Sequence, residues 1–221
     1  MQGDLLALHT TSRGCHVARL AADGTMSGAT APQASSALPE LALEVAGRPF
    51  APAAIAVACG PGSFTGIKIG LASAWGLARP ARLRVLGVGS LDALAAAGRA
   101  AAGARAGAVV AVCGAYAGFV YAARFRAGAL AEELELEGDY VVGKPLEILP
   151  QILKDVTQVL VESTPLCDVA MPVLDPFLPV RVEPGVALAE AVATLAKSRD
   201  AKSLQQSPRA LYLRADPAKA W

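Results

Sequence analysis

The sequence predicts an α/β protein with two halves, each a mixed sheet flanked by helices. Three strand-like segments open the chain, and helix-like and strand-like segments then alternate. A similar order restarts after residue 107, which indicates an internal duplication. The 54% hydrophobic and 18% charged residues are sufficient for a large core. We therefore expect a first lobe over residues 1–103 and a second over residues 104–221.

The first half begins with a predicted antiparallel meander. Asp4–His9 and Cys15–Leu20 are short apolar runs, and Asp23-Gly24 suits a tight turn before a third strand over Thr25–Thr30. The remaining pattern predicts, in order, a helix capped by Ser35 or Ser36 that ends at Gly47 with Pro39 in its first turn, a buried strand over Ala53–Cys59, a helix over Thr65–Ala78, a strand over Arg84–Val88 and a helix from Ser90 to Arg99.

The second half starts after a stretch rich in alanine and glycine at residues 100–107. Its pattern predicts, in order, strands at 108–113 and 118–126, a half-exposed strand over Glu132–Glu137, a helix over Leu146–Lys154, a strand over Thr157–Glu162 and a helix over Gly185–Arg199.

An uncharged stretch at residues 106–123 approaches the length of a membrane-spanning helix. It contains three glycines, with valines clustered on either side of Gly114. Two buried strands joined by a turn explain this pattern better, so we expect no membrane segment. The first residues are acidic and lack the basic region of a secretory signal, which predicts a cytoplasmic protein.

The charged and metal-binding residues exclude several functions. With 20 basic and 19 acidic residues, the net charge of +1 is too small to hold nucleic acid alone, so a partner would supply most of any RNA contact. The four cysteines form no C-x-x-C pair, which predicts free thiols and no metal site. His9 and His16 lack the spacing of an H-x-x-x-H metal pair. Arg79, Arg82 and Arg84 form a small basic cluster, either solvated surface or a contact for RNA or a partner.

The most informative segment is GPGSFTGIKIG at Gly60–Gly70, directly after the buried strand. Its first seven residues, which we call the signature turn, are Gly60, Pro61, Gly62, Ser63, Phe64, Thr65 and Gly66. The glycines permit close backbone approaches, and Ser63 and Thr65 can cap the following helix. The turn lacks the Gly-Lys-Ser/Thr of a Walker loop, the third glycine of a Rossmann fingerprint and the G-x-S-x-G of a nucleophile elbow.

This segment closely resembles the GPGSFTG(L/I)(R/K)IG signature of the TsaB (YeaZ) family. The resemblance continues in LALHTTSRGCHVARL, which is similar to the opening strand pair of the family, and in residues 35–47, which are similar to its first helix. Further along the chain it includes GVGSLDALA at 87–95, FVYAARF at 119–125 and PRALYLR at 208–214. It therefore covers most of the first 100 residues and less of the second half.

Membership in this family implies the ASKHA fold, with two ribonuclease-H-like lobes. It also implies a non-catalytic role beside TsaD, the subunit that forms threonylcarbamoyladenosine in tRNA, with TsaE as an ATPase partner. ATP and metal are then expected on TsaD and TsaE, and no catalytic residue, cofactor or metal in this chain. The chain would reach tRNA only through the complex and form a homodimer in isolation.

The resemblance implies a dimer or partner surface on the helix after the first strands and on the helix after the signature turn. The expected residues are Leu38, Leu41 and Val45 from the first helix and Ile67, Leu71 and Trp75 from the second. Beside the second stripe, Gly66, Gly70 and Ala74 would let another helix approach closely. The alternative is that both stripes pack on the chain's own sheet.

Three positions depart from the family pattern. Leu8-His9-Thr10-Thr11 stands where the family has I-D-T-S, Ser35-Ser36 where it has His-Ser, and Cys113-Gly114-Ala115-Tyr116 where it has an Asp-Ala-Arg stretch. Charged groove residues are thus missing at two matching places, which argues against nucleotide chemistry. We expect His9 to be a core or groove histidine and Cys59 to be a small hydrophobic residue.

Two other functions stay open at this point. One is a divergent, self-associating paralogue with no role beside TsaD. The other is an ASKHA-type small-molecule kinase, which would need carboxylates to hold magnesium. Because His9 stands at the position of the first-strand acid, the sequence favours the scaffold over the kinase.

Overall fold

The structure is a computed structural model that describes residues 3–32, 34–199 and 208–213. The chain forms two units, and neither of them is a continuous segment. The first unit comprises Met1–Ala93 and Pro184–Leu211, and the second comprises Leu94–Glu183 and Tyr212–Trp221. This division differs from the predicted lobes 1–103 and 104–221, because the chain returns to the first unit after residue 183.

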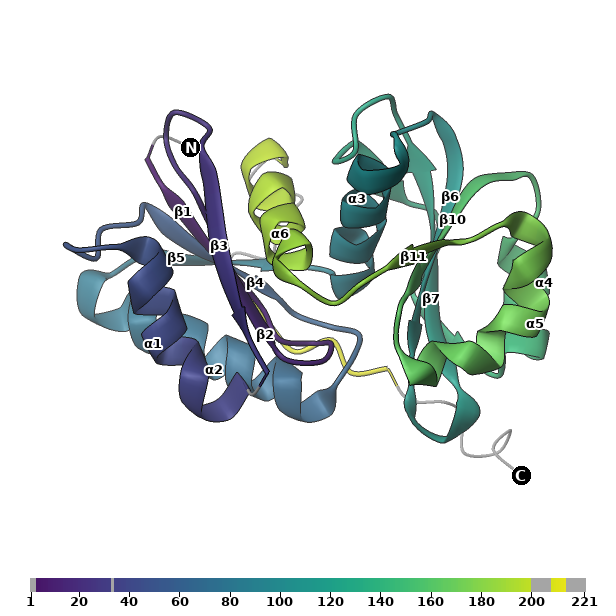
Figure 1. The fold of residues 1–221 in the computed structure, drawn as a ribbon, viewed down its shortest axis with the longest axis horizontal. Coiled ribbons are helices and arrows are strands. Elements are labelled where there is room, and N and C mark those ends of the chain that lie inside the picture. The colour runs from purple at the N-terminus through teal and green to yellow at the C-terminus, as the bar shows by residue number, and fades with distance from the viewer. Residues whose placement is uncertain (1–2, 33, 200–207, 214–221) are drawn as a thin grey trace. The chain divides into compact units, whose positions relative to one another are not determined.

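The first unit is built on a five-stranded mixed sheet (Figure 1). Its strands, in spatial order, are β3 (Met26–Ala31), β2 (Cys15–Leu20), β1 (Leu5–His9), β4 (Ala54–Ala58) and β5 (Arg84–Val88). The predicted meander is present as β1 to β3, while β1, β4 and β5 run parallel. Helices cover both faces of the sheet, so β1 and β4 are buried along their whole length.

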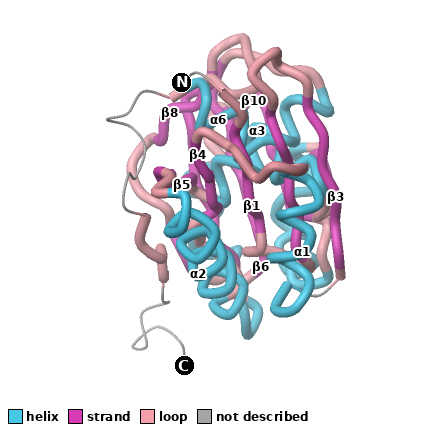
Figure 2. Tube along the Cα trace, turned by 90° about the vertical axis from the view of Figure 1, so that its left-hand side faces the viewer, coloured by secondary structure: helices cyan, strands magenta, loops and turns pink. Residues whose placement is uncertain are grey.

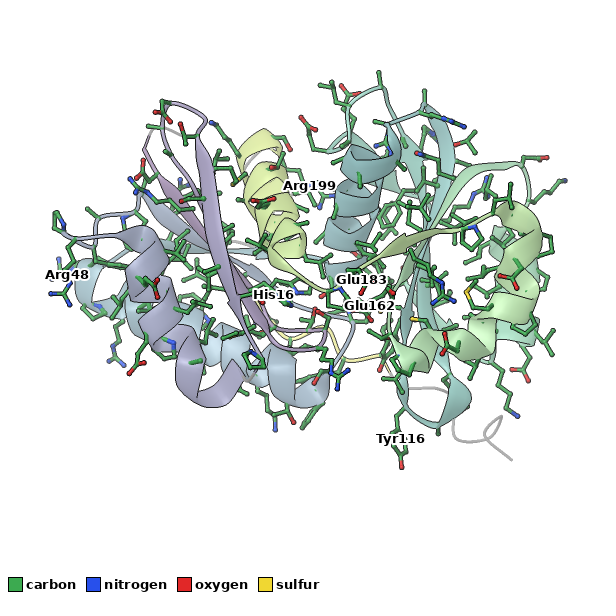
Figure 3. The ribbon with its side chains drawn as sticks, in the orientation of Figure 1. His16, Arg48, Tyr116, Glu162, Glu183 and Arg199 are labelled. Carbon is green, nitrogen blue, oxygen red and sulfur yellow. The ribbon has the colours of Figure 1, made fainter. Side chains whose placement is uncertain are left out.

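Two helices lie side by side on one face of this sheet, and a third covers the other face (Figures 1 and 2). The pair consists of α1 (Ala34–Ala46) and α2 (Phe64–Ala81), and the third helix is α6 (Val186–Ser198). Arg199, directly after α6, forms an ion pair of 2.5 Å with the buried Asp92, which fastens the end of α6 within the unit (Figure 3).

The predicted start of α1 is wrong. The helix begins at Ala34, so Ser35 and Ser36 lie inside its first turn and neither of them is the cap. Alanine has the highest helix propensity, and the helix extends to it instead of stopping at the serines. As a consequence, Pro39 falls in the second turn and not in the first.

The second unit contains a six-stranded sheet of similar topology. Its strands, in spatial order, are β11 (Val180–Val182), β10 (Val156–Glu162), β6 (Gly107–Gly114), β7 (Val120–Ala127) and β8 (Leu134–Leu136), with β9 (Val141–Gly143) also paired to β7. As in the first unit, an antiparallel set is followed by parallel strands. The uncharged stretch 106–123 is thus accounted for by β6, β7 and the turn between them. None of the helices in the described residues has the length and apolar character needed to cross a membrane.

Short helical elements complete the second unit. They are α3 (Ser90–Ala102, of which Leu94 onward belongs here), α4 (Pro145–Ile152), α5 (Met171–Leu174) and the 3-10 turns η1 (Tyr116–Gly118), η2 (Pro165–Ala170) and η3 (Asp175–Phe177). α4, η2 and α5 bury one apolar face of the sheet through Leu149, Cys167 and Leu174. Gly98 of α3 lies against Leu160 and Val182, so a residue without a side chain lets α3 approach the sheet closely.

Candidate functional site

The signature turn connects β4 to α2, and Ser63 caps the helix as predicted. The Gly66 amide donates to Ser63 Oγ over 3.2 Å, and the Ile67 amide donates to the Ser63 carbonyl over 2.8 Å. Ser63 is itself held in place, because its amide donates to the Thr11 carbonyl over 2.8 Å. The cap therefore joins the helix to the turn between β1 and β2.

The glycines of the turn are required because the chain's own backbone lies against them. A Cβ on Gly60 would lie 2.6 Å from the Leu211 carbonyl oxygen, and one on Gly62 would lie 2.5 Å from the Thr11 carbonyl oxygen. A Cβ on Gly66 would overlap the Thr10 carbonyl oxygen. Gly60 and Gly62 also have positive φ angles of 106° and 150°, which side chains disfavour. These glycines therefore serve close packing within the first unit.

Further hydrogen bonds fix the turn from three directions. Thr10 Oγ1 donates to the Gly66 carbonyl over 2.7 Å. Gly60 and Ser90 exchange two bonds, from the Gly60 amide to Ser90 Oγ over 3.1 Å and from the Ser90 amide to the Gly60 carbonyl over 2.8 Å. The Leu211 amide donates to the Cys59 carbonyl over 2.8 Å. The turn is thus the junction where four segments of the first unit meet.

His9 lies next to this junction and is neutral. Its Nε2 is 3.2 Å from Thr11 Oγ1, and its ring centroid lies 5.9 Å from that of His16. Burial, together with the nearby His16, lowers the pKa of His9 to about 3. His16 is fixed by contacts of 2.6 Å with Thr30 Oγ1 and 3.0 Å with the Arg13 carbonyl. His9 is therefore a core histidine that is neutral at physiological pH.

Cys59 and the other thiols are also structural. Burial raises the pKa of Cys59 to about 12, and its Sγ donates to the Val57 carbonyl over 3.4 Å. None of the four cysteines forms a disulfide, and all four are buried. Across the described part of the chain, no three His, Cys, Asp or Glu side chains are grouped so that they could hold a metal ion.

Comparisons with known proteins identify the family of this chain. Residues 34–154, more than half of the chain, match the profile of the family described as TsaD, tRNA N6-adenosine threonylcarbamoyltransferase. YeaZ from Pseudomonas aeruginosa has a TM-score of 0.74 at 25% identity, covering 96% of this chain and 100% of its own. The chain belongs to the TsaD family, as a TsaB/YeaZ-type protein. No curated protein matches it in sequence.

A second solved structure from Pseudomonas aeruginosa, described as similar to peptidase YeaZ, has a TM-score of 0.75 at 25% identity with the same coverage. The TsaB-type likeness over nearly the whole chain, together with the observed sheets, confirms the predicted fold class, an α/β protein with two mixed sheets flanked by helices. The family match supports a role in forming threonylcarbamoyladenosine in tRNA.

The residues expected on the TsaB-type partner surface are not equally accessible. Leu38 and Ile67 lie in the core of the first unit, with exposed fractions of 0% and 1%. Leu41, Val45 and Leu71 are partly buried against the same core, and Trp75 is 43% exposed.

The small-residue strip of α2 also faces inward. A Cβ on Gly70 would contact Thr10 Oγ1, so this part of the strip packs on the chain's own β1–β2 turn. Phe64, predicted only as part of the signature turn, is 53% exposed and lies 3.9 Å beneath the Lys68 ammonium. Its spacing of eleven residues from Trp75, three helical turns, was the sequence signal that places both on one face.

The second unit contains a buried carboxyl group that sequence reasoning missed. Glu162, the last residue of β10, is 8% exposed and accepts a hydrogen bond of 3.5 Å from Thr164 Oγ1. Burial raises the pKa of Glu162 to about 7, although bonds from Thr164 and the Gly114 amide oppose that rise. An acid directly after the apolar run at 159–161 was the available signal. Cys113 lies near it, and burial raises the pKa of that thiol well above its usual range.

Proposed function

We propose that this chain is a non-catalytic scaffold subunit that supports a TsaD-type transferase in forming threonylcarbamoyladenosine in tRNA, in the cytoplasm. The observation that carries the proposal is the filling of the signature turn. In a phosphate-binding loop, glycines let a ligand approach the backbone. Here the same positions are filled by the Thr10, Thr11 and Leu211 carbonyls, so the turn stabilises the unit and leaves little room for a nucleotide.

The outer face of α2 is the proposed partner surface. Phe64, Leu71 and Trp75 are separated by seven and four residues, so they share one face of the helix. Half-exposed aromatic residues at such positions are typical of binding hot spots. Leu41 and Val45 of α1 contribute at the margin, whereas Leu38 and Ile67 support the face from the core.

The proposal assigns the remaining chemistry to partners. ATP and metal belong to the TsaD-type and TsaE-type subunits, and this chain carries no cofactor of its own. In isolation the same α2 face would pair two copies of the chain. Homodimer formation and binding of the TsaD-type subunit would then compete for one surface.

The Trp75→Ala substitution tests the proposed scaffold role. We expect the variant to bind the TsaD-type subunit of the same organism roughly 30-fold more weakly, since a hot-spot residue contributes about 2 kcal/mol. Co-purification and a tRNA modification assay with and without this chain measure the effect. Its thermal midpoint should stay close to that of the parent, because Trp75 is already 43% exposed.

The matched control is Tyr116→Ala, which removes another exposed aromatic residue, 90% exposed, from the second unit (Figure 3). It should leave association unchanged. tRNA modification that proceeds equally well without this chain would contradict the proposed scaffold role. Micromolar, magnesium-dependent ATP binding by the isolated chain would favour a kinase instead.

A further inference from the structure

Four arginines gather at the end of the first unit where α1 and α2 terminate. Arg48 follows α1, Arg79 lies in the last turn of α2, Arg82 caps α2 and Arg84 opens β5. All four are exposed, and the labelled Arg48 projects away from the first unit (Figure 3).

The elements that carry these arginines end or begin at the same edge of the sheet. Ala46 and Phe50, on either side of Arg48, pack in the same core cluster as Ala78, Leu83 and Val85, which lie among the other three arginines. The strand register agrees, because Arg84 of β5 pairs with Ala54 at the start of β4. The segment after Arg48 leads directly into that strand. The four cations therefore lie at the edge of the sheet where β4 and β5 begin; we call them the arginine edge.

Acidic side chains of the first unit do not neutralise the arginine edge. Within residues 3–32, 34–199 and 208–213, none of the four forms an ion pair. Arg19, whose guanidinium lies near Gly47 at the same end of the unit, is by contrast neutralised by Asp4. The edge thus keeps four uncompensated positive charges on a chain whose net charge is only +1.

Arg82 occupies a position that favours glycine. Its φ of 51° and ψ of 37° are left-handed, and its amide closes the end of α2 on the carbonyls of Ala78 and Arg79. Glycine is the usual residue at this cap, since a Cβ strains the left-handed conformation. The negative end of the helix dipole attracts cations here. That attraction does not extend to Arg84, which lies on a strand.

We infer that the arginine edge binds the sugar–phosphate backbone of tRNA. Guanidinium groups bind phosphate oxygens through two parallel hydrogen bonds, and a group of arginines without ion-pair partners suits the repeating phosphates of RNA. This inference deepens the proposed function, because the complex that modifies tRNA must hold it. Four local charges on a nearly neutral chain supply part of the tRNA affinity, and the partner subunit supplies the rest.

The test measures tRNA affinity against salt. A fluorescein-labelled, unmodified tRNA transcript is titrated with the full chain, alone and bound to the TsaD-type subunit, between about 50 and 200 mM salt. The Arg48→Ala/Arg79→Ala/Arg82→Gly/Arg84→Ala variant should reduce the slope of log K against log salt by about 3, because each lost phosphate contact removes about 0.7–0.9. Affinity at the lower salt should fall at least tenfold.

The matched control is Arg13→Ala/Arg105→Ala, which removes two exposed arginines elsewhere in the chain and should leave the slope unchanged. Arg82→Gly alone separates binding from folding. It should raise the thermal midpoint by relieving the left-handed strain and still weaken tRNA binding.

An unchanged slope in the four-arginine variant, with normal binding of the TsaD-type subunit, would overturn the inference. So would loss of the TsaD-type subunit with tRNA affinity intact, because the edge would then contact an acidic protein surface. If the parent fails to bind the TsaD-type subunit but the slope still falls in the variant, the RNA contact stands and the scaffold role fails.

Discussion

The two sheets have similar topologies but bury different polar groups at the ends of inner strands. In the first unit the order β3-β2-β1-β4-β5 places a neutral histidine, His9, at the end of β1. In the second, the order β8-β7-β6-β10-β11 places a carboxyl group, Glu162, at the end of β10. Each region also contains a glycine with no room for a side chain, Gly66 against Thr10 and Gly114 against Leu166.

The comparison teaches that both regions are closely packed although their buried polar groups differ. In both regions a glycine packs closely against a neighbouring segment, so this packing does not require one particular titratable group. The buried groups nevertheless respond to pH with opposite signs. Burial favours neutral His9, which loses its proton more readily, and favours protonated Glu162, which keeps it.

Gly66→Ala should have the largest effect. The added Cβ would overlap the Thr10 carbonyl oxygen, a backbone atom that cannot move without breaking the junction. We expect a loss of at least about 4 kcal/mol in the free energy of unfolding, or no folded protein. Urea unfolding followed by circular dichroism measures it. A variant as stable as the parent would show that the turn is looser than the packing indicates.

Acid should weaken the first unit through His9. Its pKa is near 3 when folded and 6.5 when exposed, so its contribution is full above pH 6.5 and is lost as the pH falls toward 3. The full span corresponds to about 5 kcal/mol. His9→Gln, neutral at every pH, should show a shallower loss of stability between pH 6.5 and 4 in urea titrations. Part of the loss will persist, because burial also lowers the pKa of His16.

Alkali should weaken the second unit through Glu162. Its pKa is about 7 when folded and 4.5 when exposed, so its contribution is present below pH 4.5 and is lost as the pH rises through 7. The span corresponds to about 3 kcal/mol. Glu162→Gln should therefore be more stable than the parent at pH 8 and gain nothing at pH 4.5. Parallel stability curves for the two proteins would contradict the opposite-sign comparison.

Gly76→Ala should have the smallest effect and the opposite sign to Gly66→Ala. It lies in the same helix, α2, with nothing within 4 Å of the added Cβ. Alanine should stabilise the helix by about 0.5–1 kcal/mol, visible as a small rise in the thermal midpoint. The pair of substitutions separates helix propensity from packing at the signature turn.

Local patterns predicted much of the fold. The Asp23-Gly24 turn and the flanking apolar runs predicted the meander. The strand β5 has its predicted bounds, Arg84–Val88. The strand β11 was missed because three residues carry too little periodicity. The placement of α6 in the first unit was missed because its amphipathic pattern shows which residues are buried but not which sheet buries them.

The site was predictable in position but not in detail. The glycines and Ser63 indicated a constrained turn, but the neighbours that fill it, Thr10 and Leu211, are far apart in the sequence. The same limit applies to Leu38 and Ile67, because an apolar stripe on a helix does not reveal whether the sheet or a partner covers it.

The late position of α6 in the chain has a consequence for protein synthesis. The five strands of the first sheet are all made by residue 88, but one face of that sheet is covered by Val186–Ser198. At about 5–20 residues per second, a ribosome needs several seconds or more to synthesise the intervening hundred or so residues. During that interval the nascent sheet exposes an apolar face to which chaperones can bind, because the unit begun first on the ribosome receives its last helix only after the strands of the second unit have been made.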